Sequence, residues 1–233
     1  MKLNHILLII IALLTCSVSN LSQQNLYLTS WVPGNLPDMS DYEMQKFQEH
    51  VDERLPLYVV QFKKYADLYE LPWALVAAVA YQESKWDNNA VSHTGVRGLM
   101  QLTQQTADHI GIVDRENAFQ SIRGGAYYLK YLYNKTSPEL NESQRWVHAL
   151  AAYNIGWGHF RDAYRLSLRL NKDPLQWEDL KEVLPKLDDE KYSPYLRYGF
   201  ARGHEAVDFV EGVLEYYILI SRSTAQSQFI AGF

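Results

Sequence analysis

One glutamate in this sequence stands where a carboxylate is energetically costly. Apolar residues recur at helical spacing over residues 75–80 and predict a buried helix face, and Glu83 falls on that face, four residues after Val79. Burial and the nearby C-terminal end of the helix both disfavour a negative charge, so both raise the pKa of Glu83. A general acid at neutral pH needs a raised pKa of this kind. A structural alternative stays open, in which Glu83 pairs with Lys85 or Arg97.

A polar loop and two further groups of residues follow this helix. Residues 87–97 are rich in Asp, Asn, Ser, His and Thr and have little apolar content, which predicts a loop. Gly98-Leu99-Met100-Gln101 then returns the chain to apolar sequence. A third group, Ala152-Tyr153-Asn154-Ile155-Gly156, closes a later segment with helical spacing.

The chemistry open to this acid depends on whether a second carboxylate assists it. Cleavage of a glycosidic bond usually uses two carboxylates that flank the bond. The candidates nearest in sequence to Glu83 are Asp87, Asp108 and Asp114, and none has an apolar setting that would tune its pKa. One acid is enough where the substrate supplies the second group, as in substrate-assisted glycosidases.

The three groups resemble, in the same order, the motifs of the soluble lytic transglycosylase family of bacterial lysozyme-like enzymes. The matching residues are Glu83-Ser84, Gly98-Leu99-Met100-Gln101 and Ala152-Tyr153-Asn154-Ile155-Gly156. The runs AYQESKWDNNAVSHTGVRG, ALAAYNIGWGH, DPLQWEDLKEVLP and YGFARGHEAVDFVE are similar to the catalytic module of the membrane-bound lytic transglycosylase F family, over about residues 42–217. That family normally carries a solute-binding-protein-like sensor domain before the module, whereas only a signal and a short tether are expected there in this sequence.

The resemblance implies a mainly α fold, a lysozyme-like helical domain, that acts on peptidoglycan without a cofactor. It implies cleavage of the β-1,4 bond between N-acetylmuramic acid (MurNAc) and N-acetylglucosamine (GlcNAc) without water. Glu83 would be the sole catalytic residue. It would protonate the glycosidic oxygen and then, as a carboxylate, take the proton from the sugar's C6 hydroxyl, which closes a 1,6-anhydro ring. The 2-acetamido oxygen of MurNAc would stabilise the positive charge at C1.

The resemblance also implies substrate contacts from the polar loop and the group that follows it. Ser92 and Gln101 would hydrogen-bond the acetamido and neighbouring sugar groups. Met100 would form part of the apolar wall that keeps Glu83 protonated. Ordinary structural roles stay open for two of them, since Ser92 could be a loop cap and Met100 a core filler.

Three more substrate contacts are implied by later parts of the chain. Tyr153 would place its hydroxyl near the reacting centre, and Asn154 would fix the loop or bind sugar. Glu205 would contact the sugar or the loop. Tyr153 could instead be a core aromatic, Asn154 a helix cap, and Glu205 the partner of Arg202 in an ion pair. At Phe209 related enzymes often have tyrosine, so a hydroxyl contact made there would be absent.

Two other functions stay open beside the lytic transglycosylase. One is a hydrolytic muramidase (lysozyme) on the same fold, in which water takes the place of the C6 hydroxyl. The other is a non-catalytic wall-binding or envelope-assembly protein that keeps the fold. Retention of Glu83 with its surrounding motifs argues against the non-catalytic alternative.

The rest of the chain must supply the helices that position these residues. No polar–apolar alternation follows residue 40, so a mainly helical catalytic domain is predicted over residues 41–220. A helical pattern over residues 41–68, divided or kinked at Pro56, would brace the catalytic unit or bind a partner. Further segments are expected to be a turn at Gly156-Trp157-Gly158, a weakly structured tail over residues 221–233, and helices over residues 107–111, 117–133, 142–154, 161–170, 173–184 and 207–217.

Composition limits the classes of partner. The 233 residues have 47% hydrophobic content, enough to bury one sizeable core. The formal net charge is −5 and no basic cluster stands out, which argues against nucleic acid as a partner. No His, Cys and Asp set has metal-ligand spacing, so no metal site is expected, and His93 and His159 are interpreted as solvated loop residues. The expected partner is the glycan strand of peptidoglycan, and the expected state is a monomer.

The N-terminal sequence predicts export. Residues 1–19 combine a basic start, a short apolar run and a small-x-small cleavage site at Ser17-Val18-Ser19. Cys16 is the only cysteine and is a candidate lipid anchor, although Thr15 is larger than the residue usual before a lipidated cysteine; the alternative is loss of Cys16 with the signal. Residues 20–40 are predicted to be a tether. The expected location is the periplasm, attached to the outer membrane if Cys16 is lipidated.

Overall fold

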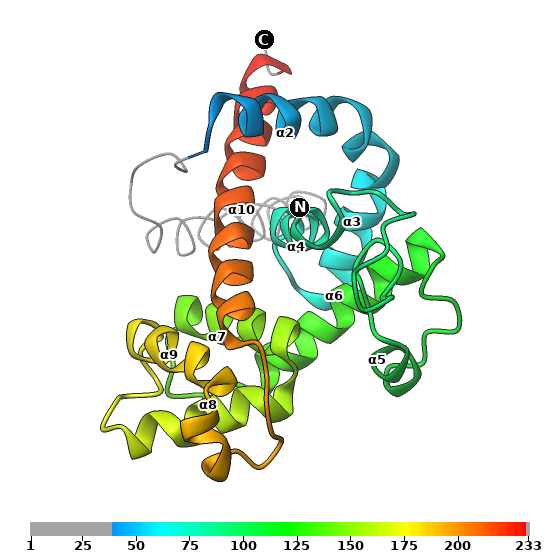
Figure 1. Cartoon of the computed structure of the whole chain (residues 1–233). Helices are drawn as coiled ribbons and strands as arrows, with labels where there is room; N and C mark the ends of the chain where they lie inside the picture. The colour runs from blue at the N-terminus through cyan, green and yellow to red at the C-terminus, as the bar shows by residue number, and fades with distance from the viewer. Residues whose placement is uncertain (1–38, 232–233) are drawn as a thin grey trace, which may run out of the picture. The chain divides into compact units, whose positions relative to one another are not determined.

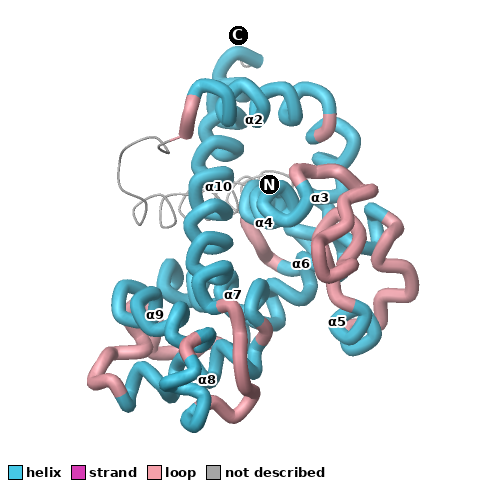
Figure 2. The backbone as a smooth tube through the Cα atoms, viewed as in Figure 1, coloured by secondary structure: helices cyan, strands magenta, loops and turns pink. Residues whose placement is uncertain are grey.

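The computed structural model describes residues 39–231, with side chains described through residue 223. Within this range the chain consists of helices and loops without a β-strand, and the bridge between Val91 and Arg97 is isolated (Figure 2). The prediction of a mainly α domain is confirmed. The predicted signal, the candidate anchor Cys16 and all but the last two residues of the predicted tether lie outside the described residues.

The described elements follow one another as Figure 1 labels them, with η for a short 3-10 helix. In chain order they are α2 (Asp41–Glu53), α3 (Leu55–Tyr69), α4 (Trp73–Ser84), α5 (Gln104–His109), α6 (Ala118–Lys135), α7 (Glu142–Ile155), α8 (Trp157–Arg169), α9 (Trp177–Val183), η1 (Leu184–Asp188), η2 (Glu190–Tyr195) and α10 (Gly203–Ala231).

Helix α4 lies at the centre of the core because it is apolar almost all round. Every residue from Ala74 to Tyr81 is buried, and a helix without a polar face can only be stable inside a protein. The long helix α10 packs along α4 and α7, while α6 packs on α3 and α7 (Figure 1). Each fully buried Val or Leu side chain in this contact contributes roughly 1.5–3 kcal/mol to stability.

Helices α2 and α3, which precede α4 in the chain, pack against it. Helix α2 begins with a reciprocal capping box between Ser40 and Glu43, which satisfies backbone N–H groups that would otherwise have no partner. The chain bends at Arg54, and Pro56 falls in the first turn of α3, where its missing N–H is tolerated. Phe47 is buried between the rings of Tyr81 and Tyr216, at centroid distances of 5.1 and 5.6 Å.

Two predicted segments are corrected by the structure. The Gly156-Trp157-Gly158 turn is reduced to one residue, because Gly156 has a φ of +85° and α8 begins at once at Trp157. Helix α10 continues through residues 221–231, which were predicted to be a weakly structured tail. No glycine or proline occurs between Gly212 and Gly232, so extending the helix adds a hydrogen bond per residue without a break. None of the helices in residues 39–231 combines the length and the apolar character needed to cross a bilayer.

Candidate active site

Glu83 is the penultimate residue of α4 and lines a cavity of about 270 Å³. Burial raises the pKa of Glu83 to about 8, and the nearby positive charge of Lys85 opposes the shift only in part. Glu83 forms neither of the two alternative ion pairs, with Lys85 or with Arg97. The Lys85 ammonium lies 3.4 Å from Gln82 Oε1 and 3.3 Å from the Tyr216 hydroxyl. Arg97 faces Glu116 at 4.0 Å.

The end of α4 is fixed by the two residues that follow Ser84. Lys85 and Trp86 both have left-handed φ values, +53° and +56°, so the chain turns sharply away from the helix. The Trp86 ring is buried, and its Nε1–H donates to the carbonyl of Ala77 at 2.8 Å. The buried hydroxyl of Ser84 lies 2.8 Å from the Leu99 carbonyl, to which it donates. The residue next to Glu83 therefore ties α4 to the Gly98–Gln101 segment.

The Gly98–Gln101 segment needs glycine at its first position. Gly98 has a φ of +92°, and a Cβ there would lie 2.2 Å from the Arg115 carbonyl oxygen. Met100 is fully buried, its side chain packs against Gly125 of α6, and its backbone N–H donates to the Ser121 hydroxyl at 3.0 Å. Met100 therefore positions the segment and is not among the residues that line the cavity.

Gln101 closes the same turn from within the cavity. Its φ is +46°, and its side-chain Nε2 donates to the carbonyls of Ala90 at 3.1 Å and Gly98 at 2.8 Å. These two bonds hold the polar loop against the segment. The side-chain carbonyl oxygen of Gln101 takes no hydrogen bond from the described residues and is the part of the amide that can accept from a sugar.

Tyr153, near the end of α7, is held in one orientation by a buried hydrogen bond. Its hydroxyl donates to the Met100 carbonyl at 3.0 Å, and its ring stacks on Phe209 of α10 at 6.1 Å and 4°. Burial and the Glu83 charge raise the pKa of Tyr153 well above its ordinary value. Because its proton is already donated to Met100, the hydroxyl oxygen can only accept a further bond.

The cavity brings together six of the seven residues predicted for the site. Only Met100 stands outside; the others that line it are Glu83, Ser92, Gln101, Tyr153, Asn154 and Glu205. The Ser92 hydroxyl accepts from the backbone N–H of Val96 at 2.9 Å, as a loop cap would. Asn154 is exposed, and Glu205 is exposed and pairs with Arg202 at 3.2 Å.

Several cavity residues were missed by the reading of the sequence. His93 is exposed on a turn, as predicted, but it also lines the cavity and lies 2.5 Å from Arg202 Nη1. The same prediction for His159 is corrected, because His159 lies within α8 and is half-buried. Thr103 and Thr106 also line the cavity, where Thr103 caps α5 by accepting from the Thr106 N–H at 3.1 Å. Its position directly after the Gly98–Leu102 run could have identified Thr103 as a residue of the site. Nothing in the sequence distinguishes Tyr128 as a site residue, because α6 contains several tyrosines that differ only in the direction they face.

A second carboxylate in the cavity comes from α10 and not from the residues near Glu83 in sequence. Asp87 accepts from the Asn89 N–H at 2.9 Å, and Asp114 accepts from the N–H groups of Glu116 and Asn117 at 3.0 and 3.1 Å. Both are loop caps outside the cavity. Glu205 does line it, but its side chain is exposed and already paired with Arg202.

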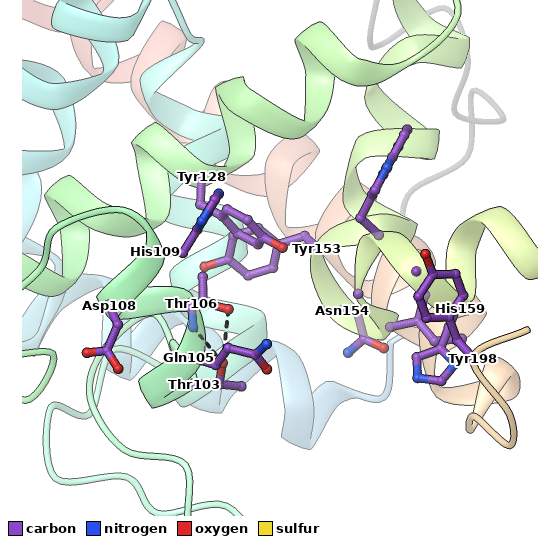
Figure 3. Close-up of a pocket in the computed structure, with 14 residues that line it drawn as sticks. Thr103, Gln105, Thr106, Asp108, His109, Tyr128, Tyr153, Asn154, His159 and Tyr198 are labelled. Carbon is purple, nitrogen blue, oxygen red and sulfur yellow. Dashed lines mark hydrogen bonds between the residues drawn. The ribbon is translucent and has the colours of Figure 1, made fainter.

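A wider groove of about 830 Å³ continues from the cavity between α5 and the α7–α8 junction (Figure 3). The two hollows share five lining residues: Thr103, Thr106, Tyr128, Tyr153 and Asn154. They therefore form one continuous site with Glu83 at one side. In the described part of the chain, no three His, Cys, Asp or Glu side chains gather as a metal ion would require.

Residues 61–175 match the family described as the transglycosylase SLT domain. The chain is 44% identical over 191 residues to membrane-bound lytic murein transglycosylase F of Marinobacter nauticus, covering 82% of this chain and 38% of the relative. It is 48% identical over 178 residues to the protein of that name from Shewanella denitrificans, covering 76% and 36%. The chain thus spans less than half the length of these relatives.

Solved structures agree at the level of the fold. The 70 kDa soluble lytic transglycosylase of Escherichia coli matches with a TM-score of 0.50 and 26% identity, over 77% of this chain and 26% of that chain. An inactive mutant of lytic transglycosylase Slt from Pseudomonas aeruginosa matches with a TM-score of 0.52 and 23% identity, over 71% and 24%. The family match over residues 61–175 and the relatives at 44% and 48% identity, together with the motif residues gathered around Glu83, identify the chain as a member of the SLT-domain lytic transglycosylase family.

Proposed function

We propose that the chain is a peptidoglycan lytic transglycosylase that cleaves the MurNAc–GlcNAc β-1,4 bond and forms 1,6-anhydro-MurNAc. The observation that carries the proposal is the state of Glu83. It is a carboxyl group with a pKa of about 8 that lines a cavity and takes no hydrogen bond from the described residues. Such a group is protonated at neutral pH and free to give its proton to a substrate. The family and the names of the relatives support the same activity.

The reaction needs only Glu83 and groups of the sugar itself. Glu83 gives its proton to the glycosidic oxygen as the C1–O bond breaks, and GlcNAc leaves as the alcohol. The 2-acetamido oxygen of MurNAc bonds to C1 and takes up the positive charge. The C6 hydroxyl then attacks C1, the acetamido oxygen leaves, and the hydroxyl proton returns to the Glu83 carboxylate. The enzyme is regenerated and no water is consumed.

The polar residues around Glu83 fit this sequence of steps. We assign the Gln101 side-chain oxygen and the Ser92 hydroxyl to the acetamido and neighbouring groups of the sugar. The Tyr153 oxygen, which can only accept, is assigned to a hydroxyl of the reacting sugar. Asn154 and Glu205 are assigned to sugar contacts at the exposed side of the cavity.

Hydrolysis on the same fold is the second candidate. It needs a base for the attacking water, and Glu205 is the carboxylate in the cavity that could act as one. An intramolecular C6 hydroxyl has the advantage of a high effective concentration, up to ~10⁵ M or more in well-oriented cases. We therefore favour the anhydro product.

The location follows from the same substrate. Peptidoglycan lies outside the cytoplasmic membrane, so we propose that the chain is exported through residues 1–19 and works in the periplasm as a monomer. Attachment to the outer membrane through Cys16 is the accompanying proposal. Mass analysis of the purified, secreted protein tests it, because a diacylated or triacylated Cys16 at the mature N-terminus supports the anchor, whereas a start beyond residue 19 contradicts it.

Mass analysis of fragments released from purified sacculi tests the activity. The expected fragments end in 1,6-anhydro-MurNAc, are one water lighter than lysozyme products and lack a reducing end. Digestion in heavy-oxygen water separates the two candidates, since only a hydrolase incorporates the label. Labelled reducing MurNAc as the dominant end would make the protein a muramidase, and intact sacculi would support the non-catalytic alternative.

A further inference from the structure

The far end of the groove carries an aromatic side chain on a segment outside the matched family region. Tyr198 lies between η2 and α10, beyond residue 175, and lines the groove. Figure 3 places Tyr198 and His159 at one end of the groove, with Asp108 and His109 at the other and Asn154 between them. None of the proposed catalytic steps uses Tyr198.

A buried carboxylate fixes the backbone of this segment. Asp162 of α8 is completely buried, and it accepts from the backbone N–H groups of Arg197 at 3.0 Å and Tyr198 at 2.7 Å. Arg165 forms an ion pair with the same carboxylate. A carboxylate is costly to bury unless it is paired and hydrogen-bonded, and here both conditions are met by groups that hold Tyr198 in place.

The ring of Tyr198 is positioned as firmly as its backbone. It covers Gly158, where an added Cβ would lie 2.8–3.0 Å from three ring carbons, so only glycine allows this approach. The His159 ring meets it edge-on, at 6.2 Å and 68°. Despite these contacts Tyr198 is 47% exposed. An ordered aromatic ring that stays open to a groove is a surface for a ligand rather than part of the core.

The chemistry of the groove indicates a hydroxyl-rich ligand. Its lining holds hydroxyl, amide and imidazole groups together with Asp108, and no lysine or arginine of the described chain lines it. The Arg197 guanidinium lies 5.9 Å from the centre of the Tyr198 ring, so a positive charge stands beside this end of the groove although Arg197 does not line it. A pyranose ring has an apolar face of C–H groups that packs on an aromatic ring and a rim of hydroxyls that bond to such polar groups.

We propose that Tyr198 is a stacking platform for a sugar ring distant from the cleaved bond, and that Asp162 is its positioning residue. This inference rests on the proposed function for the identity of the sugar chain. It gives the groove a specificity role: strands long enough to reach Tyr198 bind more tightly than short ones. The gain corresponds to one aromatic contact, roughly three- to tenfold in affinity.

The test measures binding apart from cleavage. Peptide-free glycan strands, separated into tetrasaccharides and long strands, are titrated against Glu83→Gln by calorimetry, alone and combined with Tyr198→Ala. We expect Glu83→Gln to bind long strands more tightly than tetrasaccharides. Adding Tyr198→Ala should weaken the binding of long strands roughly three- to tenfold and leave the binding of tetrasaccharides unchanged, so that the preference is lost. An unchanged preference, or no preference in Glu83→Gln itself, overturns the inference.

Matched variants separate stacking from general damage. Tyr195→Ala removes a ring of similar exposure, 48%, that covers Arg169 and does not line the groove, so the preference should remain. Gly158→Ala keeps the Tyr198 ring but displaces it, and should reduce the preference. Asp162→Asn should do the same and lower the melting temperature, because the buried anchor is weakened.

The outcomes distinguish this inference from the proposed function. Anhydro products from the unmodified protein together with a length preference that ignores Tyr198 would leave the activity standing and remove the platform. A Tyr198-dependent preference in a protein that leaves sacculi intact would keep the platform and remove the enzyme.

Discussion

Arg202 reaches His93 across the exposed side of the Glu83 cavity, with 2.5 Å between Arg202 Nη1 and His93 Nε2. A guanidinium can only donate, so Nε2 of His93 carries no proton and accepts. The same Nη1 lies 3.2 Å from Glu205 Oε1. One side chain before α10 therefore links the polar loop that carries Ser92 to the second carboxylate of the cavity.

We expect Arg202→Ala to loosen this side of the site more than it affects the chemistry. Exposed charged contacts are worth about 0.2–1 kcal/mol, so KM for glycan strands should rise roughly two- to fivefold with a smaller change in kcat. Steady-state kinetics measure both. Lys181→Ala is the control, because it removes an exposed ion pair with Glu211 away from the cavity. An equal effect of both variants would mean that the link has no local role.

Glu83→Gln should fold and lose nearly all activity. The amide has nearly the shape of the acid but cannot give a proton, and loss of an essential acid costs on the order of 10²–10⁴-fold in rate. Release of soluble fragments from sacculi measures the loss. Glu205→Gln is the comparison: a much smaller loss fits a single acid, whereas a loss equal to that of Glu83→Gln would indicate a pair of carboxylates and a hydrolytic reaction.

The pH dependence of kcat/KM should contain a falling limb near pH 8. Glu83 is protonated below its pKa of about 8 and ionised above it, so the free enzyme loses its acid by a factor approaching ten per pH unit on the alkaline side. Rates measured with a soluble glycan substrate from pH 5 to 10 check this. A fall in kcat/KM near pH 4–5 would mean that the surroundings of Glu83 do not disfavour its ionised form.

The same pKa gives a prediction about stability. The folded-state pKa of Glu83 lies above the unfolded value near 4.3, so the stabilisation from burying the neutral acid is complete below about pH 4.3 and is lost as the pH rises through about 8. Glutamine cannot ionise. Denaturant unfolding should therefore show Glu83→Gln gaining stability relative to the unmodified protein as the pH rises, by at most about 1.4 kcal/mol per pH unit in that window. A constant difference would contradict the shift.

Gly98→Ala should be far more damaging than Gly95→Ala. Both glycines have positive φ values, +92° and +78°, so alanine strains the backbone at each. A Cβ at Gly95 has no atom within 4 Å, whereas at Gly98 it would lie 2.2 Å from the Arg115 carbonyl. We expect about 1 kcal/mol for Gly95→Ala and several kcal/mol for Gly98→Ala in thermal unfolding. Equal losses would mean that the Gly98 contact can relax.

The residues named by the family resemblance were predicted to share one site, whereas the contacts between distant side chains were not predicted. Glu83 was placed correctly at the end of a buried helix because of the apolar run before it, although α4 is apolar almost all round and the spacing does not single out one face. His93 and Arg202 are 109 residues apart, and neither has a pattern that points to the other. Met100 was given a wall-forming role because an apolar residue in a motif does not reveal whether its side chain or its backbone meets the site.

The helices show the same division. Helices α6 and α7 were predicted in type and place, because apolar residues repeat at helical spacing over residues 117–133 and 142–154. The early start of α8 depends on Gly156 alone turning the chain, and the sequence Gly-Trp-Gly fits a longer turn equally well. Asp162 is polar and reads as part of the solvated face of α8, because the backbone N–H groups that justify its burial lie 35 and 36 residues away.

Because α10 packs along α4 and α7, the smallest fragment of this chain that can fold must contain α10. The matched family region ends at residue 175, yet the α10 side chains that cover α4 and α7 lie beyond it, among them Val210, Val213 and Tyr217, all completely buried. A fragment cut at the family boundary would leave the apolar flank of α4 open to water and would aggregate. The region that matches the family and the region that can fold by itself therefore end at different residues. A truncated version made for crystallisation or for a fusion protein has to keep α10.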